Sequence, residues 1–384
     1  MDKSHSSLAT SNLGMPLEQY VLAYRNAIMG PPDWFGELQH ERVLADIEKV
    51  SVIGRARLYN LDNISISTLR SILHYSYSPS YYRVLGSPAL ISGCIKIMSS
   101  IRGLGRESSL GYELGYACLQ IIAIGLGACL LQSGKDLGFS VEESPAAPFG
   151  PEIPRIYEVS QVTSQLVAEL ASHLGGSLVI SVSEAGALLN LLYTDRHPFL
   201  QVMRSTYLQG LSAVTFVLWR YATYQRSLKG SQETGKHFAS LQEVLWRSWL
   251  VSTPHEQATF VHMYRWDKGL WPKGGEGSTV TAELQDSNTV IGTFIERLEP
   301  AVGAGRKVTL PVSLSDLINA FNYVGNYFRP GCEGLAAGYF GVVVEHMWHI
   351  LSNQEGNVPL FNRAVGTSML SMFWYVYPPQ ITHI

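Results

Sequence analysis

The feature that most constrains this chain is an apolar segment from Gly115 to Leu131, whose 17 residues include one strongly polar side chain, Gln120. Such a segment must leave water, because exposed apolar surface costs free energy in proportion to its area. Two environments satisfy that demand. The segment is close to the minimum length for crossing a bilayer, about 20 residues. Alternatively, a helix that is apolar on nearly all sides lies in the core of a protein.

The composition fits a buried helix. Charged residues make up 15% of the 384 residues, hydrophobic residues make up 46%, and the formal net charge is −3. The charged fraction is below the usual figure of about a quarter, as expected when stacked helices bury much of one another's surface. The two next most apolar segments, 208–224 and 335–351, contain charged residues that are expensive within a bilayer. Anchoring in a membrane through 115–131 therefore stays the less favoured alternative.

Helical spacing runs through most of the chain. Leu17, Tyr20, Val21, Tyr24 and Ile28 lie at i, i+3, i+4, i+7 and i+11, which is one helix face. By similar patterns we expect helices over 38–50, 65–77, 88–101, 109–132, 156–174, 184–193, 198–228, 237–250, 254–265, 281–298, 314–328, 333–352 and 359–375. Only 177–182 and 308–312 resemble strands, and they are too few for a sheet. The predicted fold class is all-α.

The distribution of polar residues and prolines suggests four parts. Residues 1–14 are polar and rich in serine, which is typical of a flexible N-terminal arm. Residues 15–131 form a first helical array. Residues 132–155 contain four prolines and are predicted to be a connection. Residues 156–384 form a second helical array, which we expect to be continuous with the first.

One stretch resembles an armadillo-type repeat. In that family, a helix that begins with a small residue and proline is followed by a serine-containing turn and a longer buried helix. Here Gly86-Ser87-Pro88 leads to Ser99-Ser100, and 111–131 follows as the apolar helix. The resemblance covers about 50 residues around 86–131, and it implies an irregular armadillo- or HEAT-like superhelix that binds peptides or proteins in a concave groove. The asparagines of the family's groove are not recognisable, so no binding residue is transferred. A compact multi-helical domain is the alternative.

A cluster of aromatic residues is the candidate partner-binding site. It consists of Tyr75, Tyr77, Tyr81 and Tyr82, together with Arg83. Tyrosine offers a large contact area with a polar tip, and tyrosine and arginine are both enriched where proteins meet. The alternative interpretation is that these rings pack between neighbouring helices.

The best metal-like spacing is Glu345-His346 with His349 three residues later. Residues at i and i+3 lie on one helix face, so both imidazoles could point the same way. Zinc requires at least three protein ligands, and no nearby cysteine or aspartate supplies another. These residues are weak candidates, and we expect neither a metal nor another cofactor.

Motifs for nucleophilic catalysis and nucleotide binding are missing from the sequence, including G-x-S-x-G, the Walker A motif and the Rossmann glycine pattern. Asp195 is predicted to cap the helix that includes Pro198. The cysteines Cys94, Cys118, Cys129 and Cys332 form no CxxC pair, so we expect buried thiols in a reducing compartment.

These observations favour a soluble intracellular scaffold or adaptor that binds a protein or peptide partner. Without a basic excess, nucleic acid is not an expected partner, and neither is a membrane. No signal peptide is recognisable, so the predicted location is cytoplasmic or nuclear. The alternatives are a membrane-anchored protein, and a helical enzyme or small-molecule carrier with a pocket between helices.

Overall fold

A computed structural model describes residues 10–25, 40–76, 82–103, 108–133, 163–167, 179–206, 208–229, 231–253, 256–257, 259–260, 263–264, 283–299, 312 and 314–353. Within these ranges the chain forms 13 α-helices and one 3-10 helix, and no strand. The predicted all-α class is therefore confirmed. The chain divides into two compact units, Met1–Leu270 and Trp271–Ile384.

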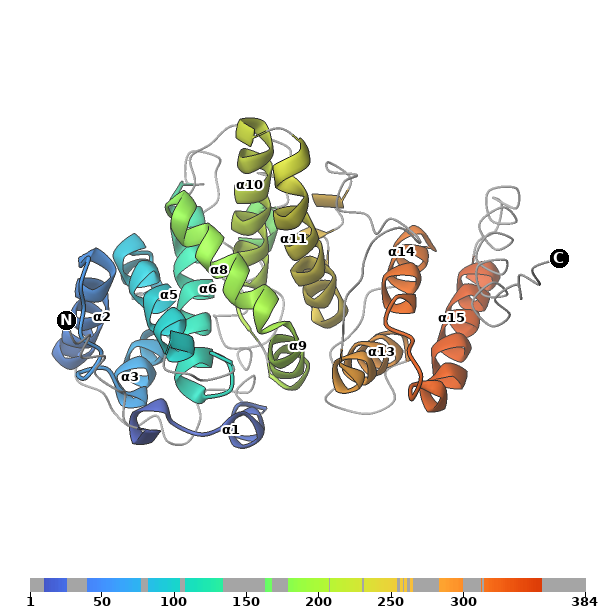
Figure 1. Ribbon diagram of the computed structural model, residues 1–384, viewed down its shortest axis with the longest axis horizontal. Coiled ribbons are helices and arrows are strands. Elements are labelled where there is room, and N and C mark those ends of the chain that lie inside the picture. Colours follow the sequence, from blue (N-terminus) through green and yellow to red (C-terminus); the bar gives the residue numbers. More distant parts are fainter. Residues whose placement is uncertain are drawn as a thin grey trace. The chain divides into compact units, whose positions relative to one another are not determined.

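The first unit holds the longer series of helices (Figure 1). They are η1 (Thr10–Leu13), α1 (Leu17–Tyr24), α2 (His40–Arg55), α3 (Ile66–Ser76), α4 (Tyr82–Leu85), α5 (Pro88–Gly103), α6 (Glu113–Ser133), α8 (Val182–Thr194), α9 (Arg196–Ser205), α10 (Leu211–Lys229) and α11 (Ser231–Val251). The second unit holds α13 (Leu284–Leu298), α14 (Leu314–Gly325) and α15 (Glu333–Asn353).

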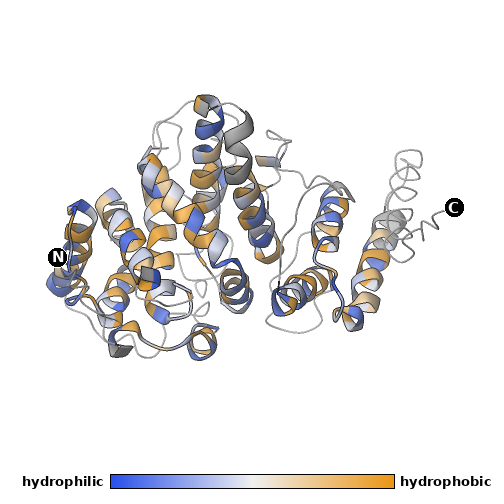
Figure 2. Cartoon of the chain, viewed as in Figure 1, coloured by the Kyte–Doolittle hydropathy of each residue, from blue (hydrophilic) through white to orange (hydrophobic). Residues whose placement is uncertain are grey.

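The apolar segment that constrained the sequence forms α6, at the centre of the first unit. This helix contacts η1, α3, α4, α5 and α10, and Figure 2 shows hydrophobic residues along it. Its one strongly polar side chain within the segment is also accommodated: Gln120 donates to the hydroxyl of Tyr116 (3.1 Å), which in turn donates to Thr206 (2.9 Å). Among the described helices, α6 alone is long and apolar enough to cross a membrane, and 94% of its most apolar window is buried inside the protein. Such burial is typical of a core helix.

Several contacts join helices that lie far apart in the sequence. Helix α1 contacts α9, α5 contacts α8, and α6 contacts α10. In a superhelix of stacked repeats, each repeat contacts only its neighbours. The described contacts therefore favour compact packing in the first unit, and the solenoid arrangement is not shown. The predicted serine turn also differs, because Ser99 and Ser100 lie within α5 and donate to carbonyls one turn earlier.

Helices α2 and α5 meet at glycines that bring their backbones together. A Cβ on Gly54 would lie 1.9 Å from the carbonyl oxygen of Ala89, and one on Gly93 would lie 2.2 Å from that of Val50. At the end of α2, the ammonium of Lys96 from α5 donates to three backbone carbonyls at 2.6–3.1 Å. A cation is favoured there because the last carbonyls of a helix lack partners and carry partial negative charge.

The single helix predicted over 198–228 is divided into α9 and α10. The break ends at Gly210, which has a φ of +80°. A Cβ there would lie 2.6 Å from the carbonyl oxygen of Ala123 in α6. Glycine is therefore required both by its backbone conformation and by the close approach of α6.

Tyr339 is the centre of the aromatic core of the second unit. Its ring stacks on Phe321 at 4.8 Å and contacts Phe294 and Phe328. Its hydroxyl donates to the carbonyl of Phe321 (2.7 Å), so the polar tip is paired within the core. These contacts hold one side of α15 against α13 and α14.

Several predictions fall wholly or partly outside the described residues. These are the N-terminal arm, the 134–155 part of the proline-rich connection, much of the predicted helices 156–174 and 254–265, and all of the predicted helix 359–375. The strand expected over 177–182 does not form in its described part, since Val182 begins α8. Of the strand expected over 308–312, only Val312 is described.

Candidate functional site

The described part of the tyrosine cluster lies inside the protein. Tyr75 on α3 is buried, its hydroxyl contacts the ring of His40, and the two rings stack at 5.5 Å. Tyr77 and Tyr81 lie outside the described residues, as do the side chains of Tyr82 and Arg83 in α4. Tyr75 thus packs between α3 and α2, and a partner-binding role for the remaining four residues stays a prediction.

The predicted metal-like residues lie on α15. Glu345 is exposed, and Nε2 of half-buried His346 lies 3.1 Å from the carbonyl oxygen of Val312. The side chain of His349 lies outside the described residues. Throughout the described residues, no three histidine, cysteine, aspartate or glutamate side chains are placed to hold a metal ion together. The imidazole of His346 thus forms a hydrogen bond with the backbone carbonyl of Val312.

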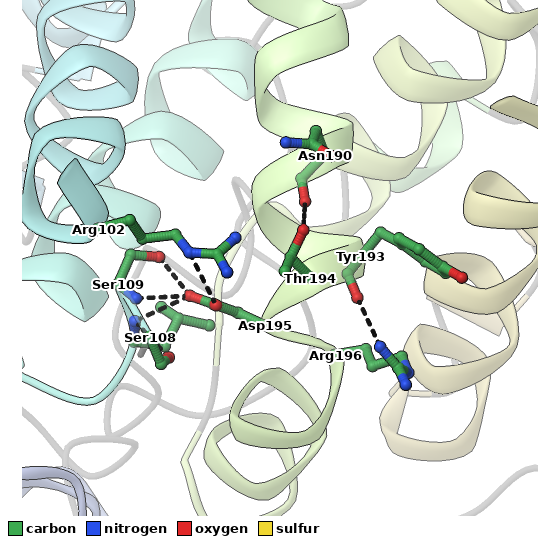
Figure 3. A network of polar contacts seen from close by, with 9 residues as sticks. Arg102, Ser108, Ser109, Asn190, Tyr193, Thr194, Asp195 and Arg196 are labelled. Atoms are coloured by element: carbon green, nitrogen blue, oxygen red, sulfur yellow. Dashed lines mark hydrogen bonds and ion pairs between the residues drawn. The ribbon is translucent and has the colours of Figure 1, made fainter. Parts of the chain in front are cut away.

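The structure contains two buried polar networks, and the first is centred on the carboxylate of Asp195 (Figure 3). Asp195 precedes α9 as its N-cap residue, but its side chain makes no capping hydrogen bond. Its Oδ2 instead accepts from the backbone amides of Ser109 (2.7 Å) and Leu110 (3.2 Å), and from the hydroxyl of Ser109 (2.5 Å). Arg102 Nε lies 3.9 Å from the other carboxylate oxygen. The predicted cap position is right, but the carboxylate holds the turn before α6.

A buried glutamate at the start of α6 forms the second network. Glu113 accepts from Arg70 Nε (2.7 Å), from the hydroxyl of Tyr24 (3.0 Å) and from the backbone amide of Met15 (3.2 Å). Burial, followed by the negative charge of Glu113, raises the pKa of Tyr24 above its ordinary value. Tyr24 therefore stays protonated at any physiological pH and keeps donating. Burial likewise raises the pKa of Tyr20, whose hydroxyl donates to the carbonyl of Leu110 (2.6 Å).

Both networks join separate segments of the first unit in its interior. Ser109, Asp195 and Glu113 are fully or almost fully buried, so these carboxylates and the serine hydroxyl are shielded from solvent. Residues 109–113 are held by the link between η1 and α1, by α1 and α3, and by Asp195 at the start of α9. Arg102 of α5 lies beside the Asp195 carboxylate. Removing a charge from water costs several kcal/mol unless partners replace the lost hydration. Here the partners are the segments that must be held together, so we interpret both networks as structural.

Whereas these networks bury polar groups, helix α15 exposes apolar residues to solvent along one side. Its exposed residues include Gly334, Ala337, Gly341, Val344 and Trp348, which lie at i, i+3, i+7, i+10 and i+14 on one side of the helix. Val344 is 51% exposed and Trp348 is 69% exposed. We call these five residues the α15 face.

The glycines of the α15 face are not explained by packing inside the protein. Among the described residues, a Cβ on Gly334 or Gly341 would meet nothing within 4 Å. Glycine in a helix interior costs about 1 kcal/mol relative to alanine, so Gly341 weakens α15 with no described side chain that requires it. The glycines of the α15 face produce a flat strip of backbone bordered by Val344 and Trp348.

The recurrence of small residues in α15 is a sequence feature that could have indicated this exposed face, but helical spacing alone does not reveal it. The helix was expected over 333–352 as an apolar one, and it forms. However, α6 and α15 are both apolar around much of their circumference. Periodicity alone does not say that, among the described elements, α6 contacts five and α15 contacts only α13 and α14. The distinguishing sign is the recurrence of small residues at Gly334, Ala337, Gly338 and Gly341.

No protein-family model, curated protein or solved structure matches this chain.

Proposed function

We propose that the protein is an intracellular helical scaffold that binds a partner protein through the α15 face. The observation that carries this proposal is the exposure of Val344 and Trp348 beside uncovered helix glycines. Contiguous apolar surface that a protein leaves in water marks sites of interaction, whereas scattered apolar residues do not. The proposal needs no concave groove, so it holds for a compact helical protein as well as for the predicted superhelix.

The α15 face suits a partner that presents a helix. Small residues let two helix backbones approach closely, and a helix laid in such a strip makes contacts along its whole length. Trp348 is placed to anchor one end, because tryptophan is the residue type most enriched among those that dominate binding energy. Glu333 and Glu345 are exposed on the same helix, so we expect a mainly apolar partner helix with a basic residue at its edge.

Covering this face would contribute favourably to binding, against the loss of translational and rotational freedom on association. Complete burial of a large apolar side chain contributes about 1.5–3 kcal/mol. Val344 and Trp348 are already partly buried, so they contribute roughly 1–2 kcal/mol each. Each 1.4 kcal/mol is about a tenfold change in affinity.

The test compares two surface variants of the full chain. We expect Val344→Asp combined with Trp348→Ala to reduce recovery of a bound partner by about tenfold or more, since it places a charge in the contact and removes the anchor. The measurement is quantitative mass spectrometry of proteins that are recovered with the tagged chain. Leu22→Asp is the matched control, because Leu22 is 65% exposed on α1 in the first unit.

The control should recover the same partner as the wild type, and both variants should keep the wild-type far-UV dichroism. A partner that is retained equally by all three chains would show that binding does not use the α15 face.

A further inference from the structure

Large and small residues lie at mirrored positions along the α15 face. Trp348 and Gly334 are each seven residues from Gly341, on opposite sides of it. Val344 lies three residues after Gly341 and Ala337 four residues before it. All five residues are exposed. The large residues therefore occupy the half of the face after Gly341, and the small residues occupy the half before it.

This pattern is complementary to itself when it is reversed. We consider a second α15 helix that lies antiparallel across the first, with the two copies of Gly341 at the crossing point. At about 1.5 Å and 100° per residue, Trp348 of one copy then lies opposite Gly334 of the other. Val344 lies opposite Ala337 on the same flank by the same measure. A two-fold axis relates the copies, so each contact occurs twice. Large residues thus fill the space beside small ones, as in close helix pairs.

A parallel pair lacks this complementarity. It would place Trp348 against Trp348 and Gly334 against Gly334, so bulky rings would collide at one end and a gap would remain at the other. Gaps and collisions both cost free energy in a packed interface. The residues of the α15 face therefore favour the antiparallel arrangement.

Gly341 lies where the antiparallel pair is tightest, because a residue at the two-fold axis meets its own copy. Among the described residues, a Cβ on Gly341 would meet nothing within 4 Å, so no described part of a single chain requires glycine there. Without a Cβ from either copy, two helix backbones can approach closely. A second copy thus explains a residue that weakens an isolated helix.

The acidic residues of α15 set the salt dependence of such a pair. Glu333 and Glu345 are exposed, and α15 contains no lysine or arginine. A second copy thus supplies the apolar helix expected of a partner, but not its basic edge. In the antiparallel pair, Glu345 lies beside Gly338 of the other copy and on the flank opposite Glu333, so carboxylates do not meet directly. They still repel at longer range, so salt should strengthen the pairing, whereas it would weaken binding of a basic partner.

The contact is small, which makes the pair reversible. The α15 face spans about 21 Å from Gly334 to Trp348. A helix pair of this length covers less than the total of about 1,200–2,000 Å² that stable interfaces bury. We therefore expect a dissociation constant of about 10–100 μM.

From these observations we propose that the partner bound at the α15 face is a second copy of this chain, and that the two copies pair as antiparallel α15 helices centred on Gly341. The inference rests on the proposed use of the α15 face for binding, and it commits that face to one partner. Pairing then depends on the concentration of the chain by mass action.

The first test is sedimentation velocity of the full chain at a series of concentrations. The wild type should pass from monomer to dimer as its concentration rises, and at lower concentration when salt is added. Gly341→Leu should weaken dimerisation by about a hundredfold, because the two-fold axis brings two added side chains into one space and each costs about tenfold. A wild type that stays monomeric throughout the series would overturn the proposal.

Ala45→Leu is the matched control, because it adds the same side chain at an exposed position of α2. It should dimerise as the wild type does. Leucine favours helix at both positions, so both variants should keep the wild-type far-UV dichroism. Equal dimerisation of the two leucine variants would overturn the assignment of the contact to α15.

An exchange of sizes tests the antiparallel register. Trp348→Ala should weaken dimerisation by about tenfold or more, and Gly334→Trp alone should also weaken it, since two tryptophans would then meet. Combining the two substitutions should restore most of the loss, because each tryptophan again faces a small residue of the other copy. Separate local effects on α15 would instead make the double variant weaker than either single one, and that result would overturn the register.

A crosslink serves if these variants fail to fold. Gly341→Cys places two thiols at the two-fold axis, and the native cysteines are buried. Oxidised glutathione takes up two electrons and becomes two reduced glutathiones as the thiols lose their protons and form a disulfide. The disulfide-linked dimer should form about tenfold faster than with Val52→Cys on exposed α2. Equal rates would overturn the proposal.

The two proposals can fail separately. Loss of the dimer in the variant with Val344→Asp and Trp348→Ala supports both. A monomeric wild type from which that variant loses a different bound protein would overturn self-pairing and leave the proposed function standing. A dimer that persists in that variant, with every partner still recovered, would overturn both.

Discussion

At the scale of single residues, Asp195 shows how a local role differs from a long-range one. The residues around it predict the start of a helix, and a helix does begin beside it. Its carboxylate, however, holds amides 85 and 86 residues away in the sequence. Sequence near a residue can predict a cap, because a cap depends on residues within one turn. It cannot predict Ser109 as the partner, because that choice depends on how α6 packs.

We predict that Asp195→Ala lowers the free energy of unfolding by about 3 kcal/mol or more, since the amides of Ser109 and Leu110 lose a charged acceptor while buried. The measurement is denaturant unfolding of the variant and the wild type. Glu48→Ala is the control: Glu48 pairs with Arg55 at the surface, and such exposed pairs contribute about 0–1 kcal/mol. Equal losses in the two variants would contradict the structural role of Asp195.

At the scale of elements, helix positions were predictable to a greater degree than helix ends. Apolar spacing located α2, α3, α5, α6 and α15 within a few residues. The break between α9 and α10 was missed because no proline marks it, and one glycine in an apolar stretch is compatible with a helix. The helix breaks there because the backbone of α6 lies beside Gly210, and the sequence around Gly210 does not reveal that contact.

Two glycines should therefore respond to alanine with opposite signs. Gly210→Ala should lower the free energy of unfolding by about 1–2 kcal/mol from the left-handed backbone alone, with the approach to Ala123 adding more. Gly341→Ala should raise it by up to about 1 kcal/mol, because this interior position of α15 has open space among the described residues. Thermal or denaturant unfolding checks both. Stabilisation by Gly210→Ala would refute the close approach to α6.

At the scale of the whole molecule, the arrangement of helices was the least predictable part. Periodicity tells which side of a helix is apolar, but not which other helix covers it. Tyr24 of α1 donates to Glu113 at the start of α6, 89 residues later in the sequence, and no spacing within either helix encodes that contact. The exposed α15 face was missed for the same reason, whereas the burial of Tyr75 agrees with the alternative that the tyrosines pack between helices.

The burial of α6 leads to a prediction for the intact protein. If α6 is a core helix, the full chain should be recovered without detergent, and its far-UV dichroism should be strongly helical. Light scattering coupled to size-exclusion chromatography checks that the particles are discrete. Recovery that depends on detergent would mean that the apolar surface of α6 lies in lipid, contrary to its contacts with five neighbouring elements.

The docking of the N-terminal helix on the start of α6 has a consequence during synthesis. Tyr24 is made 89 residues before Glu113, and ribosomes add about 5–20 residues per second. Tyr24 therefore emerges from the ribosome roughly 4–18 seconds before Glu113, because both residues must pass the same exit tunnel. The apolar side of α1, with Tyr20 and Tyr24, is then available to chaperones, so the newly made chain should depend on them most before residue 113 appears.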